Sequence, residues 1–239
     1  MDDFKGYLEK ELELAPQTVA TSIYSLKGAI RTLIERSSDL SLKQIFFIER
    51  KLKSIKPPRP ATRVIPKEKI LSEKEIQRLL DHLPRSVFSV CTLLKESGIR
   101  VSEALNLKWK DLKQHSNGAT LEVMGKGDIF RTIRISFELL ELLLHERETR
   151  EVESDYIFAT KSGKPLSRTN LHKTIHRYGK KILLKENVGC HTFRHSFATR
   201  LLKNGADVGS VSRYLGHASP ATTLSFYCHN QLSDEQLFG

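Results

Sequence analysis

Cysteine is scarce in this chain, with three residues among 239. So few cysteines cannot form a disulfide framework in a chain of this length, and we expect a reducing compartment, the cytoplasm. Long apolar runs are also absent: no stretch approaches the roughly 18 residues of a transmembrane helix, so we expect no membrane partner. The N-terminus, MDDFKGYLEK, carries acidic residues where a signal peptide carries basic ones, so export is not indicated.

The motifs that bind common cofactors are missing as well. There is no Gly-x-x-x-x-Gly-Lys-Ser/Thr loop and no Gly-x-Gly-x-x-Gly loop, so nothing indicates ATP hydrolysis or a dinucleotide. His191 and His195 are four residues apart, but no glutamate follows the first of them, as it would in a zinc protease helix. They could be combined on paper with Cys190, Cys228 and His229, but this set matches no recognised ligand spacing. We therefore expect no metal ion and no cofactor.

Positive charge is what the chain has in excess. Thirty-nine Lys and Arg residues stand against 28 Asp and Glu residues, which gives a formal net charge of +11 and an isoelectric point near 9.6. A basic protein of this size often binds a polyanion, usually nucleic acid. Charge that only aids solubility is the alternative at this point. With 39% hydrophobic and 28% charged residues, the chain is ordinary for a folded protein.

The chain divides into two modules joined by a proline-rich segment. Residues 1–56 show helical periodicity, and we interpret them as a small helical N-terminal module. Residues 57–66 hold four prolines, which oppose both helix and central strand and indicate an extended linker. Arg59 and Arg63 in this linker could follow a phosphate backbone or belong to a solvated hinge. Residues 67–239 form the second module.

The second module combines many helices with a few short strands. Its first local signal is a capping box, in which Ser72 caps a helix and Glu75 reaches back. The expected strands are residues 119–124, 129–135 and 156–158, with a tight glycine turn at 125–128. The expected helices are residues 72–83, 86–97, 101–107, 136–150 and 167–181, then three that begin near residues 191, 207 and 219. This pattern predicts a mainly α fold with a small antiparallel β-sheet, in the α+β class.

One segment of the second module carries charge of a single sign. Residues 161–185 contain eight Lys or Arg residues and no acid. Such a run favours phosphate contacts more strongly than the total charge does. The expected DNA-binding residues here are Lys161, Lys164, Arg168, Lys173 and Arg177.

A set of cations and one tyrosine remains as the candidate chemistry. Arg100 follows the helix-ending Gly98, and Glu103 three residues later could orient it. His191 and Arg194 lie three residues apart, so they share one face of a helix. Lys126 stands at the tip of a turn, His217 follows a helix end, and Tyr227 comes ten residues after it. Taken singly, each of these residues has an ordinary structural explanation.

Taken in order, these residues resemble the signature of the tyrosine recombinases, the phage integrase or Xer-like family. Three segments carry the resemblance: Gly98-Ile-Arg-Val-Ser-Glu-Ala-Leu-Asn-Leu-Lys-Trp-Lys-Asp-Leu112, His191-Thr-Phe-Arg-His-Ser-Phe-Ala-Thr199, and Leu215-Gly-His-Ala-Ser-Pro-Ala-Thr-Thr-Leu-Ser-Phe-Tyr-Cys-His229. The resemblance covers residues 67–229 well and the N-terminal helices only loosely. It implies a catalytic domain at 67–239 and a core-binding, SAM-like helical module at 1–56. This module is shorter than the family's usual four- or five-helix domain, and residues 231–238 could form one short helix that docks on a neighbouring subunit.

The resemblance also implies a role for each catalytic residue. Tyr227 is expected to be the nucleophile that attacks the scissile phosphate, and Lys126 the general acid that protonates the departing 5′ hydroxyl. The remaining expected residues act on the phosphate or on proton transfer: Arg100 and Arg194 bind the non-bridging oxygens, His191 serves in proton transfer with the tyrosine, His217 hydrogen-bonds the phosphate, and Glu103 supports Arg100.

Elementary chemistry accounts for these residue types independently. A phosphodiester is anionic and gains charge density in the transition state, and planar guanidinium groups match its geometry with paired hydrogen bonds. Preorganised cations can take the place of a metal ion in this role. A tyrosine with a pKa of about 10 needs a base or a cationic pocket to attack at neutral pH. The phosphotyrosine bond keeps the energy of the cut strand, so rejoining needs no ATP.

The expected function is therefore site-specific DNA recombination through a 3′-phosphotyrosine intermediate and a Holliday junction. Exchange between two sites needs four active sites, so we expect the protein to bind double-stranded DNA as a homotetramer. Without DNA we expect a monomer or a weak oligomer. Accessory DNA-bending proteins are further candidate partners. A catalytically silent DNA-binding regulator is an alternative, but it predicts a lost Tyr, Arg or Lys. A type IB topoisomerase-like enzyme is another, and it predicts activity as a monomer. Integration or excision, dimer resolution and DNA inversion all stay open.

Overall fold

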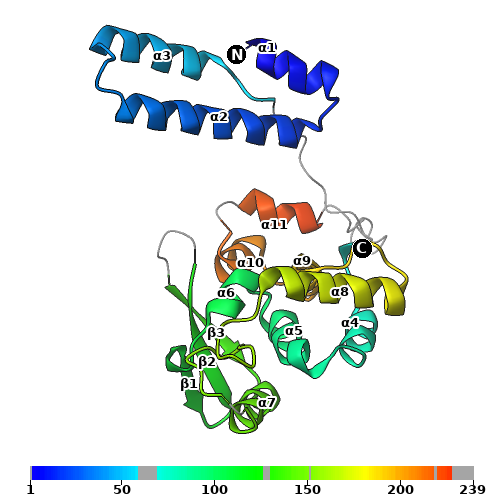
Figure 1. Cartoon of the computed structure of the whole chain (residues 1–239). Coiled ribbons are helices and arrows are strands. Elements are labelled where there is room, and N and C mark those ends of the chain that lie inside the picture. Colours follow the sequence, from blue (N-terminus) through cyan, green and yellow to red (C-terminus); the bar gives the residue numbers. More distant parts are fainter. Residues whose placement is uncertain (1, 59–68, 126–129, 151, 218–219, 228–239) are drawn as a thin grey trace, which may run out of the picture. The chain divides into compact units, whose positions relative to one another are not determined.

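The computed structural model of the 239-residue chain describes residues 2–58, 69–125, 130–150, 152–217 and 220–227 (Figure 1). The chain separates into two compact units, Met1–Arg63 and Val64–Gly239. Most of the proline-rich linker, including Arg59 and Arg63, lies outside the described residues.

The first unit is a small helical module. Its elements are α1 (Asp2–Gly6), a π-helical turn (Tyr7–Glu11), α2 (Pro16–Arg36) and α3 (Leu42–Ser54). Pro16 starts α2 because its fixed φ suits the first helical position, and Ser41 with Gln44 forms a capping box at α3. The buried side chains of Leu8, Val19 and Ile55 make its core. Local caps and a narrow apolar stripe thus hold these helices together.

The second unit contains one three-stranded antiparallel sheet in the order β1-β2-β3. The strands are β1 (Leu112–His115), β2 (Gly118–Met124) and β3 (Phe130–Ile135). Leu121 pairs with Leu112 on one side and with Ile133 on the other. The two long strands agree with the sequence analysis to within one residue.

The third expected strand was wrong. Residues 156–158 form no strand: Tyr156 makes only an isolated bridge to Lys108, and Ile157 donates its backbone N–H to Leu107. Ile157 and Phe158 are apolar because they are buried in the core rather than because they alternate across a sheet. The true third strand, β1, escaped notice because most of its side chains are exposed at a sheet edge and therefore polar.

The helices of the second unit begin at residues that the sequence analysis indicated. They are α4 (Glu73–Leu80), α5 (Arg85–Ser97), α6 (Val101–Asn106), α7 (Phe137–Glu148), α8 (Arg168–Leu183), α9 (Cys190–Lys203), α10 (Val208–Leu215) and α11 (Pro220–Tyr227), with a 3-10 turn at Trp109–Asp111. Ser72, Ser136, Ser167 and Asp207 all cap helices through their side chains. The mainly α fold with a small antiparallel sheet is thereby confirmed.

The first helix of this unit ends earlier than we expected. It stops at Leu80 instead of reaching Leu83. His82 and Leu83 donate their backbone N–H groups to carbonyls three residues back, which tightens the chain into a turn. Pro84 follows and cannot continue a helix through its missing N–H.

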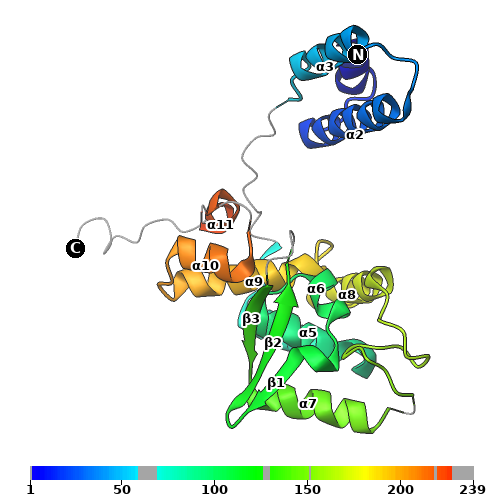
Figure 2. The same cartoon turned by 90° about the vertical axis from the view of Figure 1, so that its left-hand side faces the viewer.

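Helix α9 runs through the middle of the second unit and is packed by α5, α8, α10 and α11 (Figures 1 and 2). Phe193 of α9 is completely buried in the main core, which also contains Leu94 and Ile133. Helix α7 packs against the sheet. The last residues of β2 and the first residues of β3 lie on the side of the sheet's unit where α9, α10 and α11 are found (Figures 1 and 2).

Across the described ranges, no helix is both long enough and apolar enough to cross a membrane.

Candidate functional site

Arg194 is the most deeply buried charged residue that the sequence analysis singled out. It lies in the second turn of α9, and only 4% of its surface is exposed. Its guanidinium donates to the carbonyl of Gly98 at 2.9 Å and to that of Leu215 at 2.8 Å. Gly98 ends α5 in the left-handed conformation, and Leu215 is the last residue of α10. Arg194 therefore ties three helices together at one point.

Burial has an electrostatic consequence for Arg194. Burial, and after it the neighbouring charge of Arg100, lowers the pKa of the guanidinium to about 10. The partial negative charges of the two carbonyl oxygens stabilise the charged form of Arg194 at this buried position. Leu215 belongs to the last turn of α10, where the helix dipole favours positive charge.

Arg100 approaches the same helix end from another side. It precedes α6, and its guanidinium donates to the carbonyl of Gly216 at 2.6 Å and to Glu103 Oε1 at 2.8 Å. Its backbone N–H donates to Glu103 Oε2 at 2.8 Å. The Arg100 side chain keeps 31% of its surface exposed, so it can still meet a ligand. Glu103 does orient Arg100, as its spacing suggested.

The sequence analysis missed a third arginine. Arg131 of β3 donates to both oxygens of Glu103, at 3.2 Å to Oε1 and 2.6 Å to Oε2. Its side chain is 13% exposed and that of Glu103 only 6%. A signal was present: successive side chains alternate in a strand, so Arg131 shares the inward face of β3 with the buried Ile133 and Ile135.

The cluster therefore carries excess positive charge. Within the described part of the chain, Glu103 accepts hydrogen bonds from the guanidinium groups of Arg100 and Arg131, and it is close enough to a third, that of Arg194, to act on its pKa. Burial by itself would raise the pKa of Glu103, but hydrogen bonds from Arg131 and Arg100 outweigh burial and lower it. Glu103 is thus an anion at neutral pH, and two positive charges are left without a carboxylate partner. Partly buried cations in such excess are suited to an anionic ligand.

Two histidines border this cluster. His217 follows Gly216, and its Nδ1 is 2.8 Å from the hydroxyl of the buried Thr223 in α11. Burial, followed by Arg194 and Arg100, lowers the pKa of His217 to about 4. His191 in the first turn of α9 is exposed to solvent, and partial burial of its ring together with nearby arginines lowers its pKa as well. Both imidazoles are therefore neutral at pH 7.

A third histidine, His195, lies close to the first two. The ring of His195 faces that of His191, with 6.3 Å between ring centroids. Burial lowers the pKa of His195 to about 4, and His191 and Arg194 act in the same direction. The sequence analysis considered His195 only as a metal candidate. In the described residues, no group of three or more His, Cys, Asp and Glu side chains is placed to hold a metal ion.

Two expected catalytic residues are located only in part. Lys126 lies outside the described residues, between β2 and β3 in the sequence. Tyr227 is the last residue of α11, a helix that packs against α9 and α10, and its side chain is not among those described. The structure thus brings together Arg100, Glu103, Arg194 and His217, with His191 at the edge.

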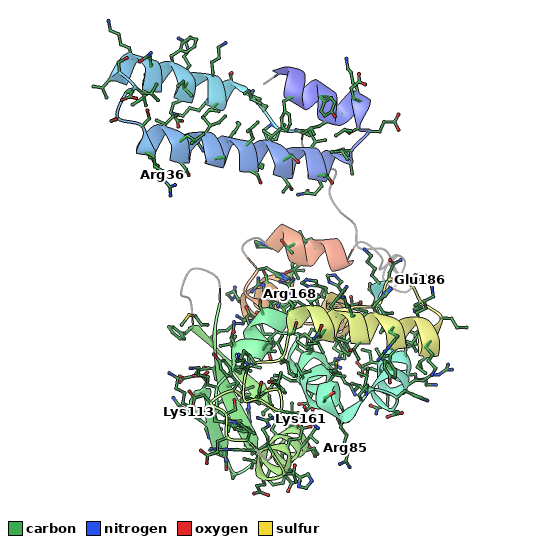
Figure 3. The ribbon with its side chains drawn as sticks, in the orientation of Figure 1. Arg36, Arg85, Lys113, Lys161, Arg168 and Glu186 are labelled. Atoms are coloured by element: carbon green, nitrogen blue, oxygen red, sulfur yellow. The ribbon has the colours of Figure 1, made fainter. Side chains whose placement is uncertain are left out.

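The five expected DNA-binding residues of the second unit are all exposed, but they do not form one group. These are Lys161, Lys164, Arg168, Lys173 and Arg177. Arg168, the first residue of α8, is close enough to His191 to act on its pKa. In Figure 3, Arg168 lies at the end of α8 near α6 and α11, whereas Lys161 lies toward α5 and α7. Arg168 is therefore the one of these two that borders the cluster.

Comparisons with known proteins agree on one family. Residues 69–233 match the model of the Phage integrase family. The tyrosine recombinase XerC of Rickettsia bellii is 31% identical over 225 residues, which cover 87% of this chain and 68% of that protein. The tyrosine recombinase XerD of Staphylococcus aureus is 36% identical over 143 residues, which cover 57% of this chain and 48% of that protein.

A solved structure has the same fold. The crystal structure of the XerH site-specific recombinase bound to a palindromic difH substrate, a post-cleavage complex, superimposes with a TM-score of 0.72. The match covers 95% of this chain and 68% of that one, at 24% sequence identity.

Proposed function

Because this chain belongs to the phage integrase family, we propose that it is a site-specific recombinase that cuts and rejoins DNA through a covalent phosphotyrosine intermediate. Its substrate is double-stranded DNA that carries specific recombination sites, and the reaction uses neither a metal ion nor ATP.

The observation that carries this proposal is the arginine cluster. Arg100 and Arg194 are fixed on consecutive carbonyls, those of Gly216 and Leu215, at the end of α10. Each terminal guanidinium nitrogen carries two hydrogens, so each arginine retains donors for a ligand after making these bonds. A phosphodiester between two such groups would receive hydrogen bonds on its non-bridging oxygens and compensation for the excess positive charge.

The cleavage step is a transesterification. The Tyr227 oxygen attacks the phosphorus, its bond to phosphorus forms, and the bond between phosphorus and the 5′ oxygen breaks. Lys126 gives a proton to the departing 5′ oxygen, which would otherwise leave as an unstable alkoxide. His191 takes part in the transfer of the tyrosine proton, and its neutral state at pH 7 allows it to accept one. His217 hydrogen-bonds the phosphate, and Glu103 holds Arg100.

The wider assembly follows from the same chemistry. Exchange of strands between two sites passes through a Holliday junction and needs four active sites, so the enzyme works as a homotetramer on DNA. Residues 67–239 catalyse the reaction, and residues 1–56 bind the DNA core, with Arg59 and Arg63 of the linker along the backbone. The exposed Lys161, Lys164, Arg168, Lys173 and Arg177 contribute phosphate contacts. The cytoplasm, where DNA is accessible, is the proposed compartment.

The direct test is capture of the covalent intermediate. The protein is mixed with a library of nicked duplexes with randomised candidate sites, in which the cut fragment diffuses away and prevents rejoining. Complexes that resist SDS are isolated and their DNA is sequenced. Tyr227→Phe is the test variant. Tyr214→Phe is its matched control, because Tyr214 is a half-buried phenol of the same unit that stacks on Phe197.

The expected result is covalent DNA with the parent protein and with Tyr214→Phe, and none with Tyr227→Phe. DNA binding by Tyr227→Phe should stay close to that of the parent. A covalent complex with Tyr227→Phe would contradict the nucleophile assignment. A gel shift without any covalent complex would favour a silent DNA-binding regulator, and relaxation of supercoils by a monomer would favour a topoisomerase.

A further inference from the structure

Arg131 belongs to the cluster, its side chain is only 13% exposed, and it takes no part in the cleavage step proposed above. We propose, on the basis of the function proposed above, that Arg131 is a positioning residue: it holds Glu103 with a paired hydrogen bond, so that Arg100 can present its charge to the scissile phosphate.

The first observation is the hydrogen bonding of Glu103. Its Oε1 accepts from the side chains of Arg100 and Arg131, and its Oε2 accepts from the Arg100 backbone and the Arg131 side chain. Half of the hydrogen bonds that fix this nearly buried carboxylate therefore come from Arg131. Without them, Glu103 could rotate, and the direction of the Arg100 guanidinium would be less well defined.

The second step concerns charge. A pair made of Arg100 and Glu103 alone is formally neutral, and such a pair would attract a phosphate weakly. Adding Arg131 leaves the group with one net positive charge, and Arg194 adds another. Arg131 uses both terminal nitrogens on Glu103 and is more deeply buried than Arg100, with 13% of its side chain exposed against 31%. Arg131 therefore neutralises the negative charge of Glu103, and the charge of the more exposed Arg100 is available to the ligand.

The third step concerns location. A Cβ atom added to Gly216 would lie 3.4 Å from the Arg131 Nη1 and 3.6 Å from the Arg100 Nη1. Both guanidinium groups therefore approach the same point at the end of α10, next to His217. Arg131 also lies on β3, near the strand's first residue. One side chain thus connects the sheet to the residues that bind the phosphate.

The variants that test this idea are Arg131→Met and Arg131→Lys. Methionine removes the charge and both hydrogen bonds but keeps much of the side-chain length. Lysine keeps the charge and loses the paired geometry. Arg134→Met is the matched control, because Arg134 lies three residues along the same strand with its side chain exposed. Thermal unfolding of all variants shows whether each one is folded.

The first measurement compares cleavage of two nicked duplexes that differ at the scissile position. One carries the normal phosphodiester, and the other a methylphosphonate, which lacks the negative charge. Loss of a residue that orients a directly acting group typically costs about 10- to 100-fold. We expect Arg131→Met to lose about that much on the phosphodiester and several-fold less on the methylphosphonate, with Arg131→Lys in between. Equal losses on both substrates, or parental rates on both, would overturn the proposal.

The second measurement does not depend on cleavage. Inorganic phosphate that binds the folded protein raises its unfolding temperature by mass action. We expect this rise in the parent and in Arg134→Met, and a clearly smaller one in Arg131→Met. An undiminished rise in Arg131→Met would refute the positioning role even if no cleavage occurs. A different result would contradict the proposed function and leave the positioning role intact. In that result, no covalent complex depends on Tyr227, but the phosphate-induced rise in unfolding temperature still requires Arg131.

Discussion

Replacement of Arg194 by lysine keeps a positive charge and removes the flat, forked guanidinium. Arg194 makes two hydrogen bonds with carbonyls of different helices, to Gly98 and Leu215, and it is almost completely buried. A lysine ammonium is a compact charge that cannot span both carbonyls and also meet a phosphate. We therefore expect Arg194→Lys to be folded but severely impaired in cleavage.

The magnitude follows from the bonds that are lost. A hydrogen bond to a charged group contributes about 1.5–3 kcal/mol, and losing one that acts in the transition state slows the reaction by about 10- to 150-fold. A buried carbonyl left without a partner costs a further ~1–3 kcal/mol of stability. In a domain of this size, that lowers the unfolding temperature by roughly 2–4 °C per kcal/mol.

A second signature of this variant is its pH dependence. The site lowers the pKa of Arg194 from 12.5 to about 10. The same burial and the same neighbouring cations would lower the pKa of a lysine at this position below its unperturbed value of about 10.4. Its charge is present below that pKa and lost above it. Cleavage by Arg194→Lys should therefore begin to decline at a lower pH than cleavage by the parent, whose arginine stays charged at neutral pH.

The assay is single-turnover formation of the covalent complex on a nicked duplex. The matched control is Arg200→Lys, because Arg200 lies on the same helix and, like Arg194, donates to a backbone carbonyl, that of Lys95; its second partner is the carboxylate of Glu73. We expect the control to cleave at close to the parental rate. A rate for Arg194→Lys within about threefold of the parent, or a loss as large in Arg200→Lys, would refute the assignment of the guanidinium to the phosphate.

Other parts of the second unit lead to further expectations. Gly98→Ala should lower the free energy of unfolding by about 2–4 kcal/mol in chemical denaturation, because φ is +62° and a Cβ would lie 2.5 Å from Phe197 Cδ1; an unchanged midpoint would contradict this. Burial lowers the pKa of His195 to about 4, so the folded state favours the neutral imidazole; its stabilising effect is complete above about pH 6.5 and is lost as pH falls toward 4. The unfolding free energy of His195→Asn should therefore change less over that range than that of the parent, and identical curves would argue against the shift. DNA affinity should fall steeply as the salt concentration rises. If Arg168 contacts a phosphate, Arg168→Gln should reduce the slope of log K against log salt by about one. An unchanged slope would show that Arg168 is not part of the DNA interface.

Local signals in the sequence were sufficient for most of the helices. Ser72, Ser136, Ser167 and Asp207 cap helices because a side-chain oxygen and the backbone N–H groups that it accepts from are only a few residues apart. Gly98 ends α5 because glycine adopts the left-handed conformation with little strain. The same short-range logic indicated that Glu103 would hold Arg100.

Edge and core positions were harder to predict from the same information. The strand β1 is polar because it lies at a sheet edge, so it lacked the alternation that marks a half-buried strand. Residues 156–158 have an apolar pattern that a strand and a buried loop share equally. An apolar sequence pattern indicates that the residues are buried, but it does not distinguish a buried strand from a buried loop.

The sequence by itself determined the order of the helices and of the two long strands, the fold class, and the identity of the residues that resemble a recombinase site. Only the tertiary structure decided that Arg131 joins Glu103, from 28 residues further along the chain. It also placed the carbonyls of Leu215 and Gly216 against Arg194 of α9 and against Arg100, which precedes α6. Caps and turns depend on neighbours in the chain, whereas these contacts exist only after the sheet and helices α6, α9 and α10 have packed together.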